Sequence, residues 1–185
     1  LAGEPLHRYI RQRVSEPLGM ESVMCNPRAH DIELDKNAPT EVCAWRQRRC
    51  VGEVHDENAA GLGGMAGHAG LFASVADVAK LGQCFLNGGE GNGVRILAPA
   101  TVVQMTREQA SMDGLARGLG WQKKSADGGP VCPACNGESY GHTGFTGTSL
   151  WIDPDRELVV ALLTNRVYNG RDPEGISNLR RQLHA

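Results

Sequence analysis

Residues of catalytic type stand directly ahead of an apolar segment near the end of the chain. The stretch GHTGFTG covers residues 141–147, and the apolar runs LWI and LVVALL follow it. Glycines at a strand edge remove side chains, which lets a substrate backbone approach closely. His142 can supply a proton or a hydrogen bond, Thr143 a hydroxyl, and a backbone N–H just beyond can stabilise an oxyanion. The residues therefore predict a docking edge with a catalytic group beside it. The alternative is a glycine-rich strand entry with a surface histidine.

Two more histidines and an aspartate are candidate site residues. His55 and Asp56 lie in VHDEN, and His68 lies in AGHAG. Imidazole and carboxylate suit zinc, so these residues and His142 can in principle hold a metal. Their spacing matches no ligand template, and we expect no metal here. Two interpretations stay open: the segments line one wall of a substrate cleft, or the histidines hydrogen-bond backbone groups in a loop short of regular pairing.

Six cysteines leave several possibilities open. Cys132 and Cys135 have the spacing of a redox motif, but no strand–helix context surrounds them. With Cys43 and Cys50 they can form a four-cysteine zinc site or two local disulfides, and free cysteines are the third possibility. A small zinc-stabilised binding domain is therefore one alternative function.

Composition excludes several classes of partner. The formal charge of the 185 residues is −2, so no overall field favours nucleic acid or an anionic membrane. The basic cluster Arg46, Arg48 and Arg49 beside Trp45 is read as a solvated loop. The longest apolar run, Leu158 to Leu163, is far shorter than the ~20 residues of a membrane span. GLGGMAG follows no apolar strand, so we expect no dinucleotide cofactor, and no other cofactor is indicated.

Hydrophobic periodicity predicts helices and strands within one domain or part of one. An amphipathic helix is expected over 4–14, a helix with a capping box at Ser74 and Asp77 is expected to end at Asn87, and a shorter one follows over 99–105. Residues 25–58 are expected to hold little regular structure. Strands are expected over 118–122, 147–152 and 157–165, the last two joined by the DPDR loop, with a closing helix over 175–185. The chain thus divides into a mainly helical and loop part, 1–116, and a part with strands and a final helix, 117–185.

Several stretches together resemble one family. GHTGFTGTSLWIDPDRELVVALLTNR is similar to the third motif of the serine β-lactamase and penicillin-binding-protein superfamily. The resemblance is to the class C-like branch, with its family VIII esterases and D-aminopeptidases, where Lys-Thr-Gly is often His-Thr-Gly. EPLGM (16–20) and GGMAGHAGLFASVADVAKLGQCFLNGG (63–89) fit the same branch in the same order. PTE (39–41) and GEVHDEN (52–58) resemble a subgroup of bacterial serine hydrolases.

The resemblance implies a fold, a reaction and site residues. It implies an α/β fold of the α+β type and β-lactamase/transpeptidase-like kind, in which an antiparallel sheet has packed helices and a helical insertion and the N-terminal part is missing. It also implies acyl transfer through a serine ester on an amide or ester. His142 takes the place of the motif's lysine, Thr143 and Gly144 complete the motif, and the backbone N–H of Phe145 matches the second oxyanion-hole donor. Gly147, His55, Asp56 and His68 are expected to bind substrate. A neutral histidine holds a carboxylate less well than lysine, which favours a peptidase or esterase over an efficient β-lactamase.

Two family motifs do not occur in the sequence. No serine is followed by lysine three residues later, and no tyrosine by asparagine two residues later. We therefore expect the C-terminal half to two-thirds of a serine hydrolase, inactive by itself, with a small-molecule or peptide substrate. An exposed apolar face where the N-terminal strands belong would favour association or a dimer. The rival is a homologue that binds a ligand or partner without turnover. By resemblance alone, the compartment is periplasmic or extracellular.

Overall fold

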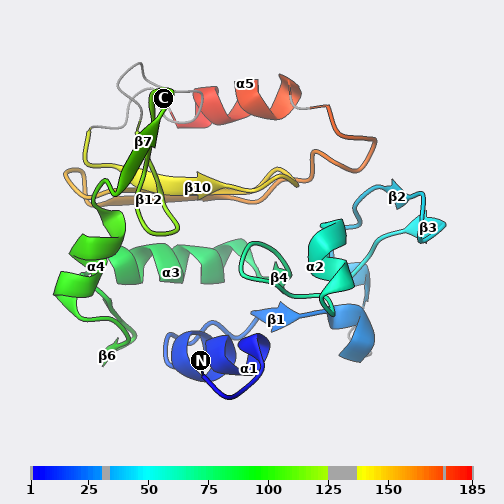
Figure 1. The fold of residues 1–185 in the computed structure, drawn as a ribbon, viewed down its shortest axis with the longest axis horizontal. Coiled ribbons are helices and arrows are strands. Elements are labelled where there is room, and N and C mark those ends of the chain that lie inside the picture. Colours follow the sequence, from blue (N-terminus) through cyan, green and yellow to red (C-terminus); the bar gives the residue numbers. More distant parts are fainter. Residues whose placement is uncertain (1, 31–33, 125–136, 173, 185) are drawn as a thin grey trace.

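A six-stranded antiparallel sheet dominates the computed structural model (Figure 1), which describes residues 2–30, 34–124, 137–172 and 174–184. The order across the sheet is β12-β11-β10-β9-β8-β7. Each strand pairs with the strand next to it in sequence, so the sheet is an antiparallel meander. Its strands are β7 (Ala110–Met112), β8 (Leu115–Arg117), β9 (Gln122–Lys123), β10 (Tyr140–Thr143), β11 (Ser149–Asp153) and β12 (Leu158–Leu162).

The predicted hairpin around DPDR is confirmed. Asp153 pairs with Leu158, so the loop contains only the four residues between them. The Asp153 carboxylate accepts a bond from the Arg156 backbone N–H at 3.2 Å and from its guanidinium at 2.8 Å. These bonds lower the pKa of Asp153 against the opposing effect of burial. Turn chemistry and the apolar flanks fix this hairpin locally, which explains why the sequence predicts it well.

The strand expected to start within 118–122 begins only at the last of these residues, as β9. Residues 118–121 form the turn between β8 and β9, closed by a bond of 2.9 Å from the Gly118 N–H to the Trp121 carbonyl. Gly120 has φ +78°, a conformation that glycine adopts without strain. The sheet already begins with β7. Its first strand therefore lies within residues 1–116, the part expected to be mainly helix and loop.

Helix α3 (Val75–Leu86) covers one face of the sheet, and its boundaries match the prediction. The Ser74 hydroxyl caps it by accepting from the Asp77 N–H at 3.3 Å. The second half of the expected capping box is replaced, because the Ser74 N–H donates to the Ser22 hydroxyl at 2.8 Å. The Asp77 carboxylate instead accepts from the Ser22 N–H at 2.7 Å. The cap thereby ties α3 to the segment that follows the first helix.

The main core lies between α3, α4 (Pro99–Thr106) and the sheet. Gly82 lets the helix approach closely, since an added Cβ would lie 2.5 Å from Val159 and 3.0 Å from Leu150. Ile152 is completely buried here. The buried members of this core are Phe85, Val102, Trp121, Tyr140, Leu150 and Ile152.

Helix α5 (Glu174–Leu183) lies across the opposite face of the sheet (Figure 1), as the expected closing helix. At the other end, the predicted N-terminal helix consists of α1 (Leu6–Ile10) and a π-helical continuation, η1 (Arg11–Ser15). It begins after Pro5, whose ring suits the start of a helix and not its interior. No helix of the described residues is long and apolar enough to cross a membrane.

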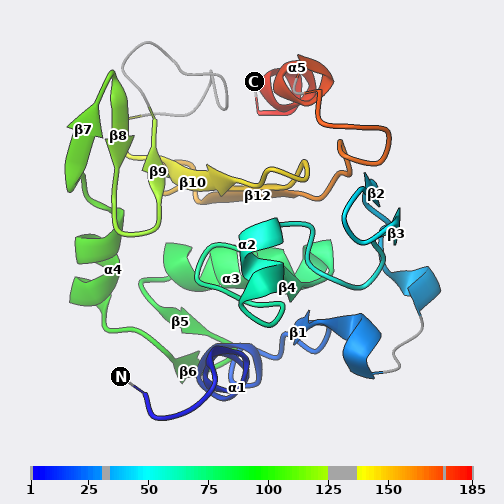
Figure 2. The ribbon, with the colours of Figure 1, turned by 45° about the vertical axis from the view of Figure 1, so that its right-hand side comes forward.

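The remaining elements of the described residues are short. Residues 25–58 hold only short ones, as the sequence predicts. Two-residue strands pair locally, and helix α2 spans one turn with Asp56 as its N-cap. Figure 2 shows the β2–β3 hairpin at one end of the molecule and β7–β8 at the other. The elements are β1 (Met24–Cys25) with β4 (Leu71–Phe72), β2 (Val42–Cys43) with β3 (Arg48–Arg49), β5 (Glu90–Gly91) with β6 (Val94–Arg95), the 3₁₀ turns η2 (Pro27–His30) and η3 (Leu34–Lys36), and α2 (Glu57–Gly61).

Candidate functional site

The GFTG turn (residues 144–147) joins β10 to β11 and carries the predicted oxyanion donor. The Gly147 N–H donates to the Gly144 carbonyl at 3.1 Å, and the Gly144 N–H donates to the Thr148 carbonyl at 2.7 Å. Phe145 follows directly on Gly144, and within the described part of the chain its N–H donates to no protein acceptor. A backbone amide fixed in a turn and free to donate is what an oxyanion hole requires.

His142 lies on the α3 face of the sheet, because it pairs with Leu150, which packs against α3. Its Nδ1 is 2.9 Å from the Thr143 carbonyl oxygen, and its Nε2 is 3.4 Å from Nη1 of Arg117. A guanidinium only donates hydrogen bonds, so Nε2 accepts and Nδ1 carries the proton. The contacts therefore assign one neutral tautomer, with the basic nitrogen directed at Arg117.

Arg117 is a residue of the site that the sequence did not reveal. It lies on β8, two strands away from β10, and its side chain is exposed. The guanidinium brings a permanent cation next to the position of the motif's lysine. No spacing signal links residues 117 and 142, because β9 and the turn before it bring their strands together.

Thr143 lies on the opposite face of the sheet from His142. It pairs with Ser149, whose hydroxyl oxygen is 3.3 Å from Nε2 of His184 near the end of α5. Successive side chains of a strand alternate between faces, so these two motif residues do not form one side-chain cluster. The predicted roles of His142 and Thr143 stay predictions, now assigned to opposite faces of the sheet. A ligand lying along the strand edge would meet them from different sides.

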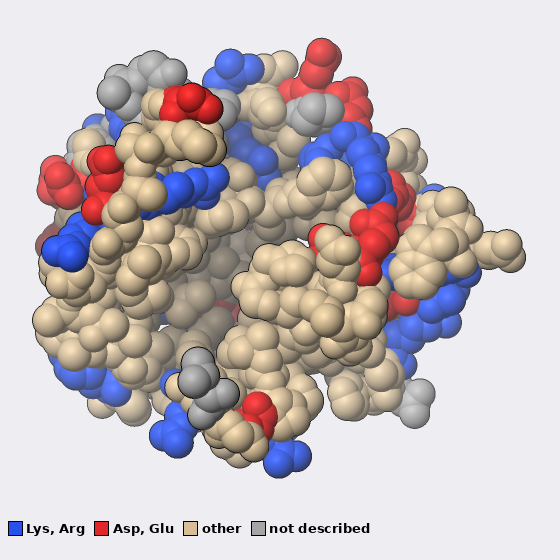
Figure 3. Space-filling model, viewed as in Figure 1, with Lys and Arg blue, Asp and Glu red and all other residues tan. Residues whose placement is uncertain are grey.

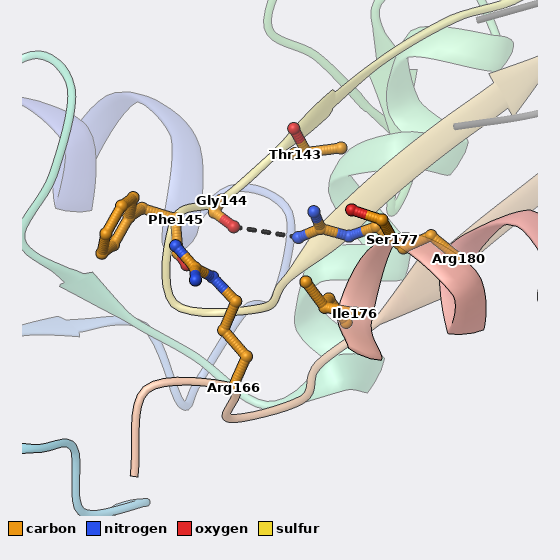
Figure 4. Close-up of a pocket in the computed structure, with 7 residues that line it drawn as sticks. All are labelled: Thr143, Gly144, Phe145, Arg166, Ile176, Ser177 and Arg180. Atoms are coloured by element: carbon orange, nitrogen blue, oxygen red, sulfur yellow. Dashed lines mark hydrogen bonds between the residues drawn. The ribbon is translucent and has the colours of Figure 1, made fainter. Parts of the chain in front are cut away.

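A cavity of about 310 Å³ lies between the turn and α5 (Figure 4). The Arg180 guanidinium reaches from α5 to the turn, where Nη2 donates to the carbonyls of Gly144 at 2.9 Å and Thr148 at 2.6 Å. Burial lowers the pKa of Arg180, and the nearby charge of Arg166 adds to this. The cavity is lined by Thr143, Gly144, Phe145, Arg166, Ile176, Ser177 and Arg180.

Internal packing leaves little room for a side chain at the three motif glycines. A Cβ on Gly141 would lie 2.3 Å from the Leu150 carbonyl oxygen and 2.5 Å from the Trp151 ring. On Gly144 it would meet the Thr148 hydroxyl at 2.1 Å, and on Gly147, with φ +115°, the Thr164 hydroxyl at 2.7 Å. The structure thus gives a reason for the glycines other than the expected close approach of a substrate. A substrate contact at Gly147 stays a prediction.

His55 is a buried residue with two specific contacts. Its side chain is 7% exposed, and its Nε2 is 3.0 Å from the Glu41 carboxylate. Its ring stacks on the ring of Phe145, with centroids 5.6 Å apart and planes at 24°. The structure therefore places His55 against Phe145 of the GFTG turn. A side chain this little exposed offers almost no surface to a ligand, and the expected substrate-binding role of His55 stays a prediction.

His68 and Asp56 pair with each other at the surface. His68 Nε2 is 3.0 Å from an Asp56 oxygen, with side chains 56% and 36% exposed. The same oxygen caps α2 by accepting from the Ala59 N–H at 2.7 Å. The bonds from Ala59 and His68 lower the pKa of Asp56. The alternative that His55 and His68 bond backbone groups is wrong for these ring nitrogens, since both meet carboxylates. A substrate-binding role for His68 and Asp56 stays a prediction.

A charged network, also unforeseen, surrounds His55. Arg171 donates to Glu41 at 2.8 Å through Nε and to Glu57 at 2.5 Å through Nη2. These bonds are the main reason why the pKa values of Glu41 and Glu57 are lowered. Figure 3 shows acidic and basic groups meeting on this side of the molecule, and a hollow in front of α3 between the sheet and α2. The partners are more than a hundred residues apart in sequence, so no local pattern predicts them.

The arginine cluster of the β2–β3 hairpin is anchored, contrary to the solvated loop that the sequence suggests. The Arg46 side chain is 5% exposed and donates to the Val54 carbonyl at 3.0 Å. Arg49 donates to the carbonyls of Thr40 and Tyr168 and lies 3.9 Å from the centre of the Tyr168 ring. Both arginines bind backbone carbonyls that the loop cannot satisfy with regular pairing.

The cysteine predictions are answered only in part. Cys132 and Cys135 lie outside the described residues, and Cys25, Cys43, Cys50 and Cys84 are free thiols. Burial raises the pKa of Cys50, although the Arg46 guanidinium at 2.8 Å acts in the opposite sense. Among the residues with described positions, no three histidine, cysteine or acidic side chains could hold a metal ion together. The four-cysteine zinc site stays a hypothesis.

Comparisons with known proteins place this geometry. The family model described as Beta-lactamase matches residues 1–185. A putative D-alanyl-D-alanine carboxypeptidase of Escherichia coli O157:H7 is 32% identical over 197 residues, covering 97% of this chain and 44% of the relative. The chain thus spans less than half the length of this relative.

Solved structures show the same fold. A β-lactamase from Mycobacterium bovis matches with a TM-score of 0.64 and 18% identity, covering 99% of this chain and 55% of that one. A family VIII carboxylesterase matches with a TM-score of 0.61 and 18% identity, covering 95% and 50%. The antiparallel sheet with helices on both faces is therefore a β-lactamase/transpeptidase-like arrangement, and over its whole length the chain belongs to the Beta-lactamase family.

Proposed function

We propose that this chain contributes the strand and the second oxyanion donor to a hydrolase that cleaves amides or esters through a serine acyl-enzyme. The observation that carries the proposal is the amide of Phe145. It follows directly on the His-Thr-Gly stretch, is held in a closed turn, and has no protein acceptor among the described residues. The family of the chain, together with its carboxypeptidase-like relative and its carboxylesterase neighbour, supports this reaction class.

In this proposal the nucleophile lies outside these 185 residues. None of the eight serines heads a Ser-x-x-Lys motif, in which the lysine one helical turn away helps to deprotonate the serine. The serine would attack the carbonyl carbon and form a tetrahedral oxyanion. Its own N–H and that of Phe145 would hold the oxygen until the leaving group departs. Water would then release the acyl group.

His142 and Arg117 define the polar edge that meets the substrate. We place the scissile bond on the α3 face, where His142 projects and where the surface is hollowed (Figure 3). His142 has its proton on Nδ1, so Nε2 can accept a proton or a hydrogen bond when Arg117 moves away. A histidine at this position favours a peptidase or esterase over an efficient β-lactamase, because a neutral imidazole does not attract a carboxylate as lysine does.

The test is covalent labelling followed by intact-mass measurement. Two proteins are treated with a fluorophosphonate and with a penicillin: the 185-residue chain and the product of the complete reading frame that encodes it. We expect a mass increase for the complete product and none for the 185 residues alone. Labelling of the 185-residue chain would overturn the placement of the nucleophile. If neither protein is labelled, the rival of a non-catalytic binding homologue replaces the proposal.

Association through exposed apolar residues is a further part of the proposal. Leu179 and Leu183 on α5 are 41% and 46% exposed, and Leu158 on the terminal strand β12 is 46% exposed. Exposed apolar residues that form a continuous patch favour contact with another chain. Sedimentation velocity at several concentrations checks this, and a compact monomer at all of them would contradict it.

A further inference from the structure

The ring of Phe145 is held by side chains from two distant segments. His55, which precedes α2, stacks on it with centroids 5.6 Å apart. The Arg166 guanidinium, which follows β12, lies 4.1 Å from the ring centre. Figure 4 shows the Arg166 side chain reaching the turn beside Phe145. Ring stacking and a cation over the ring face are both attractive, so together they restrain a side chain that is 55% exposed.

Both neighbours are themselves anchored. His55 bonds Glu41 at 3.0 Å, and Glu41 accepts from Arg171 at 2.8 Å. The Arg166 backbone N–H donates to the Thr146 carbonyl at 2.9 Å, and its Nη1 donates to the Arg171 carbonyl at 2.6 Å. The Phe145 carbonyl accepts from Nε of Arg166. Arg166 thus contacts both the ring and the peptide carbonyl of Phe145. Through Arg171 it is linked to the same charged network that holds His55.

This arrangement matters because the backbone of the turn is permissive by itself. Glycines stand at both its ends, Gly144 and Gly147, and glycine loses the most conformational freedom when it is fixed. An oxyanion donor works only if it is held in place before the charge develops, since a misplaced donor loses much of its effect. The bulky side chain of Phe145, between the two glycines, can be bound by other segments. That binding restrains the Phe145 amide.

We propose that His55 and Arg166 are positioning residues that fix the backbone amide of Phe145 through its side chain. The proposal rests on the proposed function in one respect: it takes this amide to be the oxyanion donor. In this role His55 needs no contact with substrate. Glu41 and Arg171 orient His55 and Arg166 in turn. This gives the segment 39–58 a role in catalysis although it lies outside the sheet.

The first experiment needs no activity. The order parameter of the Phe145 amide is measured by ¹⁵N relaxation in the 185-residue chain and in variants at His55, Arg166 and His7. We expect about 0.85 in the unmodified chain and less than about 0.6 after His55→Ala, the values of a rigid backbone and a flexible one. His55→Phe keeps a ring against Phe145 and should retain the higher value. His7→Ala, at an exposed histidine of α1, is the matched control and should change nothing.

A Phe145 amide that stays rigid in His55→Ala would overturn the proposal, as would equal loss of order in His55→Phe. Arg166→Met provides a second variant should His55→Ala fail to fold. It leaves the His55 contact intact and should loosen the same amide. Circular dichroism on each variant separates a local change from loss of the fold.

The second experiment measures turnover of an ester by the product of the complete reading frame. We expect His55→Ala to lower kcat about 10- to 100-fold with little change in KM, because a fixed donor acts mainly in the transition state. Inhibition by phenylboronic acid should weaken by a similar factor, because the boron in its serine adduct is tetrahedral and carries an oxygen at the oxyanion position. An active wild type with unchanged kcat in His55→Ala would overturn the positioning role alone. An inactive, unlabelled wild type would overturn the proposed function, while the relaxation measurement still decides the positioning role.

Discussion

Two regions of this molecule are stabilised in different ways. Strands β10 to β12 pack on α3 through apolar side chains, and Ile152 at the centre is completely buried. The loop region, residues 34–61, has two-residue strands and one turn of helix, and it is held by ion pairs and by arginines bonded to carbonyls. The first region sets the path of the His-Thr-Gly strand. The second meets the end of that strand at the ring of Phe145.

The difference suggests that the two regions have separate roles, one in forming the sheet and one in positioning an amide. Hydrophobic packing is strong and non-directional, so it fixes which segments form the sheet. Hydrogen bonds and ion pairs are weaker in net effect but directional, so they suit the placement of one amide group. Substitutions in the two regions should therefore separate stability from activity.

The largest loss of stability is expected for Ile152→Ala. Removing a completely buried isoleucine leaves a cavity in the main core, and such changes cost about 2–5 kcal/mol in the free energy of unfolding. Urea denaturation followed by tryptophan fluorescence measures this loss. Leu6→Ala, at a residue that is 42% exposed, is the control. Equal losses in the two variants would contradict the position of the core.

Gly141→Ala should come next. The added methyl group would overlap the Leu150 carbonyl and the Trp151 ring, and overpacking of this kind costs about 1–3 kcal/mol. Gly61→Ala is the matched control, because no atom lies within 4 Å of its added Cβ and it belongs to a helix. There we expect a gain of up to about 1 kcal/mol. The same denaturation measurement compares them, and a neutral Gly141→Ala would contradict the close packing of β10 on β11.

Arg171→Gln should affect the loop region with little loss of global stability. Its side chain is 48% exposed, and exposed ion pairs contribute about 0–1 kcal/mol. Glu41 would lose the partner that lowers its pKa, and His55 would be less well oriented. Amide exchange measured residue by residue should quicken in segment 39–58 and not in β11. The division between the regions would be refuted if exchange quickened equally in segment 39–58 and in β11, or in neither, relative to the unmodified chain.

The smallest effect is expected from His184, which touches the sheet from α5. Burial lowers its pKa, and the nearby charge of Arg180 adds to this. The folded chain thus prefers neutral imidazole, so the stability it provides is present above the ordinary pKa of 6.5 and is lost as the pH falls towards the lowered value. Between pH 7.5 and 5.5 the unmodified chain should lose more unfolding free energy than His184→Gln. If the unfolding free energies of the two proteins changed equally with pH, the burial of a neutral His184 would be contradicted.

Sequence reasoning was most reliable where the signal was local. The cap at Ser74, the DPDR loop and the glycines after α3 lie within a few residues of the structures they determine. Within 118–122 the strand starts later than expected, because a glycine turn and a strand start look alike without the partner strands. The motif predicts a candidate site at the His-Thr-Gly strand, but no sequence pattern points to Arg117, Arg166 or Arg171. Their partners come from other segments, and only the tertiary fold brings them together.

The most direct test is a crystal structure of the complete reading-frame product after labelling with a fluorophosphonate. The phosphonyl oxygen in such an adduct occupies the position of the oxyanion. We predict that it lies about 2.7–3.1 Å from the backbone nitrogen of Phe145, with the ring of Phe145 still stacked on His55. An oxygen held by other donors, with the Phe145 amide turned away from it, would contradict the account.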